Sequence, residues 1–128
     1  MSDENVEAVR ESFAAYLRGD WEEATADFAP DVVWEVGQEL PARGPAAVRE
    51  MWRRWNDDWE HLDTSIEEIV GAGDKVFLAM RYQGRGRLSG AAIDQRVFEV
   101  HTFREGKCVS KADFETRAEA LAAAGLSE

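Results

Sequence analysis

The sequence predicts an α+β protein in which helices come first and an antiparallel sheet follows. Apolar residues in the first half recur at helical spacing, and after Leu62 their period changes to two. The last four expected strands are joined by short turns, which predicts an antiparallel meander. Three helices precede this meander, and one face of its sheet is the only large surface on which they can bury their apolar sides. A chain of 128 residues fits one domain, 1–128.

The first two expected helices have recognisable ends. Apolar residues at helical spacing run over 6–17, and Gly19 ends that helix. Asp20 and Glu23 form a capping-box pattern for a second, short helix. That helix is expected to carry Phe28 on its apolar side.

A strand, a loop and a third helix come next. The strand is expected at Val32–Val36, the loop at Gly37–Gly44, and Pro45 opens the helix. Four residues fall on one apolar face of this helix: Val48, Trp52, Trp55 and Trp59. The later strands are expected at Thr64–Val70, Lys75–Gln83, Ala92–Phe103 and Cys108–Phe114. Thr116 caps a last short helix that ends at Gly125.

The charge and the single cysteine exclude several classes of protein. Fifteen basic residues stand against 26 acidic ones, giving a net charge of -11. Nucleic acids and anionic membranes are therefore not expected partners, because binding to both depends on neutralising negative charge. Cys108 has no partner for an internal disulfide, and no apolar run approaches the length of a membrane span. We expect a cytoplasmic protein.

Six short motifs occur in a specific order: Gly19–Trp21, Phe28–Trp34, Gly44–Pro45, Gly73–Val76, Phe103–Lys107 and Asp113–Phe114. Together they resemble the NTF2-like superfamily, and within it the SnoaL-like and ketosteroid-isomerase-like proteins. The resemblance covers nearly the whole chain. It implies a cone in which a curved antiparallel sheet wraps around the N-terminal helices, an interior pocket and a homodimer. Members of the superfamily include isomerases, cyclases, hydrolases, dehydratases and non-catalytic adaptors, so the fold does not select an activity.

The register of the last hairpin decides which polar residues meet. We expect a three-residue turn, Glu105–Lys107, with Gly106 in the left-handed conformation. The pairs that this turn predicts are Arg104 with Cys108, His101 with Lys111, and Glu99 with Asp113. A loop longer by one residue would place Asp113 beside Phe98, on the opposite face of the sheet.

Glu99, His101 and Asp113 are the candidate catalytic residues. Two opposed carboxylates raise the pKa of one of them, which suits a general acid or a shared proton, and a histidine exchanges protons near neutral pH. The alternative is a solvated sheet face on which Lys111 neutralises both acids. By resemblance, Glu99 falls where ketosteroid isomerases place a protonated acid, and Asp113 where limonene-type epoxide hydrolases place an aspartate. The remaining catalytic positions of those two families fall at or near Ser12, Val36, Lys75 and Phe77, so neither set is complete.

Aromatic residues are the candidates for a pocket wall. Three tryptophans on one helix face are hard to pack without voids, although such a stripe is more often plain core. The predicted wall residues are Trp34, Trp52, Trp55, Trp59, Tyr16, Met80, Tyr82 and Phe103. No second histidine lies at ligand spacing, so we expect no metal site and no cofactor.

The leading functional hypothesis is a cofactor-free acid–base enzyme that isomerises, cyclises or dehydrates a hydrophobic carbonyl compound. Asp113 would be the base or acid, His101 its proton partner, and Glu99 a hydrogen-bond donor if protonated. One alternative is a non-catalytic protein that binds a hydrophobic small molecule in the same pocket. Another is a dimerisation module with a filled interior.

Overall fold

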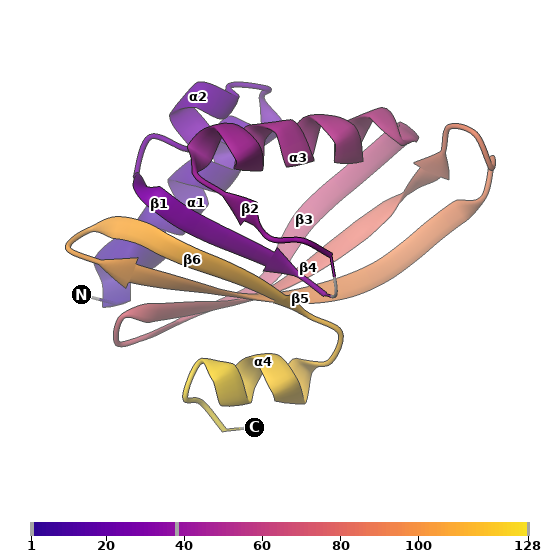
Figure 1. Ribbon diagram of the computed structural model, residues 1–128. Helices are drawn as coiled ribbons and strands as arrows, with labels where there is room; N and C mark the ends of the chain where they lie inside the picture. The colour runs from indigo at the N-terminus through magenta and orange to yellow at the C-terminus, as the bar shows by residue number, and fades with distance from the viewer. Residues whose placement is uncertain (1, 38, 128) are drawn as a thin grey trace.

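The computed structural model describes residues 2–37 and 39–127 and has a mixed α+β fold (Figure 1). The helices are α1 (Ser2–Leu17), α2 (Trp21–Ala24), α3 (Pro45–Asp57) and α4 (Arg117–Ala123). The strands are β1 (Phe28–Val36), β2 (Ala42–Arg43), β3 (Trp59–Ala72), β4 (Lys75–Gly86), β5 (Ala92–Arg104) and β6 (Lys107–Phe114). The predicted fold class is confirmed: a curved, open sheet lies against the N-terminal helices.

The six strands form one sheet in the order β2-β1-β6-β5-β4-β3. Strands β3 to β6 are the antiparallel meander that the short turns predict. Strand β1 lies beside β6 and runs parallel to it, a pairing that local sequence patterns do not reveal. It places Trp34 next to Lys111 and Val36 next to Asp113.

Helices cover both faces of the sheet. Figure 1 shows α1, α2 and α3 on one side and α4 on the other. The core on the α1 side includes Val9, Val32, Val48, Trp52, Leu78 and Met80. The core on the α4 side includes Phe77, Ala79, Val100, Ala120 and Leu121. Alternate residues of β4 and β5 therefore pack into different cores, as expected for strands with a period of two.

Two predicted helix boundaries are wrong. Helix α2 ends at Ala24 because the Thr25 hydroxyl donates to carbonyl groups of its last turn, and Phe28 opens β1 instead of extending the helix. Helix α3 ends at Asp57, and Trp59 opens β3. Acidic residues near Asp57 are unfavourable in a continuing helix, because the C-terminal end of the helix dipole is negative. In addition, Arg87 donates to the carbonyl oxygens of Asp57 and Trp59, which fixes the chain as it leaves the helix.

The turn between β5 and β6 has two residues instead of the predicted three. Arg104 pairs with Lys107, and Phe103 pairs with Cys108, so the predicted pairing of Arg104 with Cys108 is wrong. The register then shifts at a bulge in β6 between Cys108 and Ser110. Beyond the bulge His101 lies opposite Lys111, and Glu99 lies opposite Asp113, as predicted. The bulge supplies the extra residue that the prediction had assigned to the turn.

Replacing Glu105 with asparagine is expected to stabilise the protein. Glu105 has φ 52° and Gly106 has φ 78°, the left-handed pair of a type I′ turn, for which Asn-Gly is the preferred sequence. An ordinary side chain in the left-handed conformation costs roughly 1–2 kcal/mol, and asparagine avoids part of this cost. We therefore expect Glu105→Asn to raise the free energy of unfolding by roughly 1 kcal/mol. Urea denaturation measures the change. Glu60→Asn, at an exposed strand position without positive φ, is the matched control. Equal stability of Glu105→Asn and wild type would contradict this account of the turn.

Candidate functional site

A cavity of about 600 Å³ lies between the helices and the face of the sheet that they cover. Helix α1, helix α3 and strands β1, β3, β4, β5 and β6 all contribute to its lining. Six of the eight predicted wall residues line it: Tyr16, Trp34, Trp52, Trp55, Met80 and Tyr82. The wall is mainly apolar and aromatic, and the polar groups are concentrated on β5 and β6.

Trp59 and Phe103 do not line the cavity. Trp59 follows the end of α3 and packs edge-on against Trp55, with ring centroids 5.1 Å apart. Its indole N–H is buried without a hydrogen-bond partner among the described residues. Phe103 is buried in the core on the α1 side. Trp59 therefore supports the wall residue Trp55 from outside the cavity, whereas Phe103 belongs to the core.

Four ionisable side chains from two adjacent strands meet on the cavity wall; we call them the polar quartet. Glu99 and His101 come from β5, and Lys111 and Asp113 come from β6. The cross-strand pairs Glu99–Asp113 and His101–Lys111 place them side by side. Glu99, His101 and Lys111 are only 4%, 7% and 5% exposed. The solvated sheet face that the sequence left open is therefore not what these residues form.

The contacts within the polar quartet differ from the predicted ones. His101 Nε2 lies 2.8 Å from Glu99 Oε1, so His101 partners Glu99 and not Asp113. The indole N–H of Trp34 donates to Asp113 Oδ1 over 2.9 Å. Lys111 Nζ lies 3.8 Å from the centre of a Trp34 ring. Among the described residues Lys111 forms no ion pair with either carboxyl group, contrary to the neutralising role considered for it.

Burial shifts the protonation of Asp113, Glu99 and His101 toward their neutral forms. Desolvation, reinforced by the charge of Glu99, raises the pKa of Asp113 to about 8, although the Trp34 hydrogen bond and Lys111 oppose the rise. Desolvation also raises the pKa of Glu99, against the opposing effect of Lys111. Desolvation and the nearby Lys111 hold the pKa of His101 well below its usual range. His101 is therefore neutral, and Glu99 ionises before Asp113, because the charge of Glu99 contributes to the raised pKa of Asp113.

Two phenols complete the polar surface of the cavity. Burial raises the pKa of Tyr16 and raises the pKa of Tyr82 well above its usual value, so both stay protonated. Asn56 Nδ2 donates to the Tyr16 hydroxyl oxygen over 2.9 Å, which leaves the phenolic hydrogen free to donate. Asn56 was not among the predicted site residues. Its only signal was its position on α3, one turn after Trp52, whose carbonyl oxygen it also contacts.

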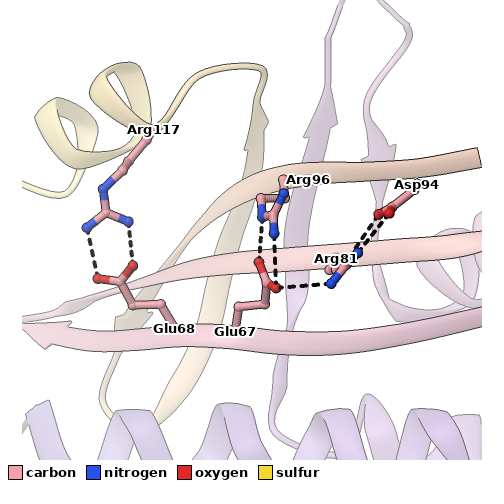
Figure 2. A network of polar contacts seen from close by, with 6 residues as sticks. All are labelled: Glu67, Glu68, Arg81, Asp94, Arg96 and Arg117. Atoms are coloured by element: carbon pink, nitrogen blue, oxygen red, sulfur yellow. Dashed lines mark hydrogen bonds and ion pairs between the residues drawn. The ribbon is translucent and has the colours of Figure 1, made fainter.

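A second network of ion pairs lies on the α4 side of the sheet (Figure 2), and one of its members, Arg96, also contributes to the lining of the cavity. Glu67 binds Arg96 over 2.7 Å, and Arg81 binds Asp94 over 2.7 Å. On the same side, Arg117 of α4 forms a two-bond contact with Glu68. Each of these charges has an opposite partner, so we assign the network to strand and helix pairing, where exposed pairs contribute modestly.

Two further observations concern metals and membranes. The described residues contain no cluster of three or more histidine, cysteine, aspartate or glutamate side chains that is placed to hold a metal ion. In the same residues, no helix has both the length and the apolar character needed to cross a membrane.

Comparison with known families identifies the fold. The SnoaL-like domain family matches residues 9–111, most of the chain. The chain belongs to the SnoaL-like family. No curated protein matches the sequence significantly.

Solved structures of NTF2-like proteins are similar over nearly the whole chain. An NTF2-like protein from Burkholderia thailandensis is 28% identical, with a TM-score of 0.79 over 95% of this chain and 97% of that one. A SnoaL-like polyketide cyclase homologue from Jannaschia is 18% identical, with a TM-score of 0.77 over 96% and 92%. A Catenulispora acidiphila protein with a ketosteroid isomerase-like fold, in complex with trimethylamine, is 20% identical, with a TM-score of 0.75 over 94% of both chains. Because the last two proteins are only 18% and 20% identical to this chain, their similarity supports the fold alone.

Asp113→Asn is expected to stabilise this SnoaL-like protein increasingly as pH rises. The folded protein holds the Asp113 proton up to about pH 8, whereas an unfolded chain releases it near pH 4. Stability is therefore lost as pH rises between these values, by at most about 1.4 kcal/mol per pH unit. Asparagine has no proton to lose and keeps an oxygen for Trp34 to bind.

Urea denaturation between pH 5 and 8.5 measures this difference in the free energy of unfolding. The exposed Asp31→Asn is the matched control and is expected to show no such trend. A gap between Asp113→Asn and wild type that stays constant with pH would contradict the raised pKa.

Proposed function

We propose that this SnoaL-like protein is a cofactor-free acid–base enzyme that moves a proton on a hydrophobic carbonyl compound, as in an isomerisation, cyclisation or dehydration. The observation that carries the proposal is the Asp113 carboxyl group, which lines an apolar cavity with a pKa of about 8. A base with a pKa near the working pH is well matched to proton abstraction. Trp34 holds this carboxyl group in place through one oxygen.

In the proposed reaction, ionised Asp113 removes a proton from the carbon next to the carbonyl group. The electrons of the broken C–H bond form a carbon–carbon double bond, and the carbonyl oxygen becomes an enolate oxygen. The phenols of Tyr16 and Tyr82 are hydrogen-bond donors on the same cavity wall. Asp113 then returns the proton to another atom, which completes an isomerisation. His101 holds Glu99 through their 2.8 Å contact.

The cavity also bears on the two alternative functions. A space of about 600 Å³ disfavours the dimerisation module with a filled interior. A non-catalytic binder would use the same cavity without proton transfer. The homodimer implied by the family remains part of the proposal, and analytical ultracentrifugation measures it directly.

Hydrogen–deuterium exchange tests the proposed proton transfer. Tryptophan fluorescence first selects a ligand from steroid, polyketide-like, terpenoid and aromatic ketones, including 2-tetralone. Proton NMR in D₂O then follows loss of the hydrogen next to its carbonyl group. We expect catalysed exchange that Asp113→Asn lowers by about 100-fold or more, the usual contribution of a general base, while ligand binding persists. Asp31→Asn should exchange at the wild-type rate. Saturable binding without exchange in the wild-type protein would identify a non-catalytic binder.

The exchange rate is expected to rise with pH. Asp113 must lose its proton to act as a base, so the rate should increase up to about pH 8 and level off above it. Rates measured from pH 6 to 9.5 with the same ketone test this profile. A flat or falling profile would assign proton abstraction to another group.

A further inference from the structure

Lys111 is a buried amine that lines the cavity without a polar partner. It is 5% exposed, and its side chain forms no hydrogen bond or ion pair with the described residues. Its nitrogen is not among the fully enclosed polar atoms without a partner, so it faces the cavity space. An ammonium group has three N–H donors and is costly to bury without acceptors. The surrounding protein supplies no such acceptor, so a molecule bound in the cavity can supply it.

Aromatic rings surround the Lys111 ammonium group on several sides. Nζ lies 3.8 Å from the centre of a Trp34 ring, 5.2 Å from that of Phe28 and 5.4 Å from that of Trp52. The faces of such rings attract a cation, which partly offsets its burial. They do not replace hydrogen-bond acceptors. The rings therefore hold the charge in place at the cavity wall while leaving it able to bind an anion.

The position of Lys111 on β6 suits a ligand that also reaches Asp113. The two residues are separated by one position and both face the cavity, so their backbone positions are about 6.6 Å apart along the strand. In a carbonyl compound the oxygen and the neighbouring carbon are separated by one atom. One end of such a group can therefore meet Lys111 while the adjacent carbon meets Asp113.

We infer that the Lys111 ammonium group binds the enolate oxygen that forms when Asp113 removes a proton from the ligand, and that the cavity prefers planar, conjugated enolates to neutral ketones. This inference deepens the proposed function and rests on it for the proton step. During that step the negative charge moves from the Asp113 carboxylate to the ligand oxygen. Lys111 already acts on the Asp113 charge at a distance, since it lowers the pKa of that group, and a direct contact with the enolate oxygen would stabilise the charge in its new position.

The experiment compares two probes of nearly the same shape. 2-Phenylindane-1,3-dione is an enolate at neutral pH, and 2-phenylindan-1-one is a neutral ketone. Isothermal titration calorimetry at pH 7 measures the affinity of each for wild-type protein and variants. We expect the enolate to bind wild-type protein at least about tenfold more tightly, as for a hydrogen bond to a charged group.

Three variants assign this preference to Lys111. Lys111→Met removes the charge but keeps a long apolar side chain, and it should abolish the preference for the enolate while leaving affinity for the neutral ketone nearly unchanged. Lys111→Arg keeps the charge and should retain the preference. Lys107→Met removes a charge from the exposed first residue of β6 and is the matched control, with both affinities at the wild-type level.

Equal affinity of the two probes for wild-type protein overturns the inference, as does a preference that survives in Lys111→Met. If Lys111→Met does not fold, the wild-type comparison and Lys111→Arg still test the inference. Loss of the preference for the enolate in Lys111→Arg, which keeps the charge, also overturns the inference. Failure of the proposed function gives a different result. If the preference for the enolate depends on Lys111 but no ketone exchanges deuterium, the cavity is an anion-binding site without catalysis.

Discussion

The pairing of β5 with β6 is the constraint on which the rest of the site depends. It places Glu99 opposite Asp113 and His101 opposite Lys111 on the wall of the cavity. A slip of one residue would turn the side chains of one strand toward α4, because successive residues of a strand face opposite sides. A two-residue turn and a bulge hold this register, so the arrangement of the ionisable groups is set by backbone geometry some distance from them.

The same arrangement sets function against stability. Apolar walls and neighbouring charges keep Asp113 protonated to about pH 8, far above the usual range of a carboxyl group. That shift favours proton transfer near neutral pH and costs folding free energy as pH rises. Trp34 connects both effects, since its N–H donates to Asp113 and its ring lies under Lys111. The parallel pairing of β1 with β6 brings these three residues together.

Local patterns predicted much of the fold but less of the site. The period of two in β5 and the short turns were sufficient for the meander. The pairing of Glu99 with Asp113 was predicted from a turn of the wrong length, and it holds because the bulge in β6 supplies the extra residue. The parallel contact of β1 was not predictable in this way, because it joins residues far apart in sequence. Trp59 was misplaced because helical spacing continues past Asp57, where tertiary contacts of Arg87 end the helix. The aromatic surroundings of Lys111 depend on three separate elements and have no local signal.

The division of the cavity between sheet and helices has a consequence for how proteins with this architecture diversify. The ionisable groups stand on β5 and β6, whereas apolar side chains such as Phe13, Met51 and Trp55 come from α1 and α3. Substitutions on the helices can therefore reshape the space for a ligand without moving the groups that handle protons. Laboratory evolution toward new substrates has a natural starting library in those helix positions, with the two strands left untouched.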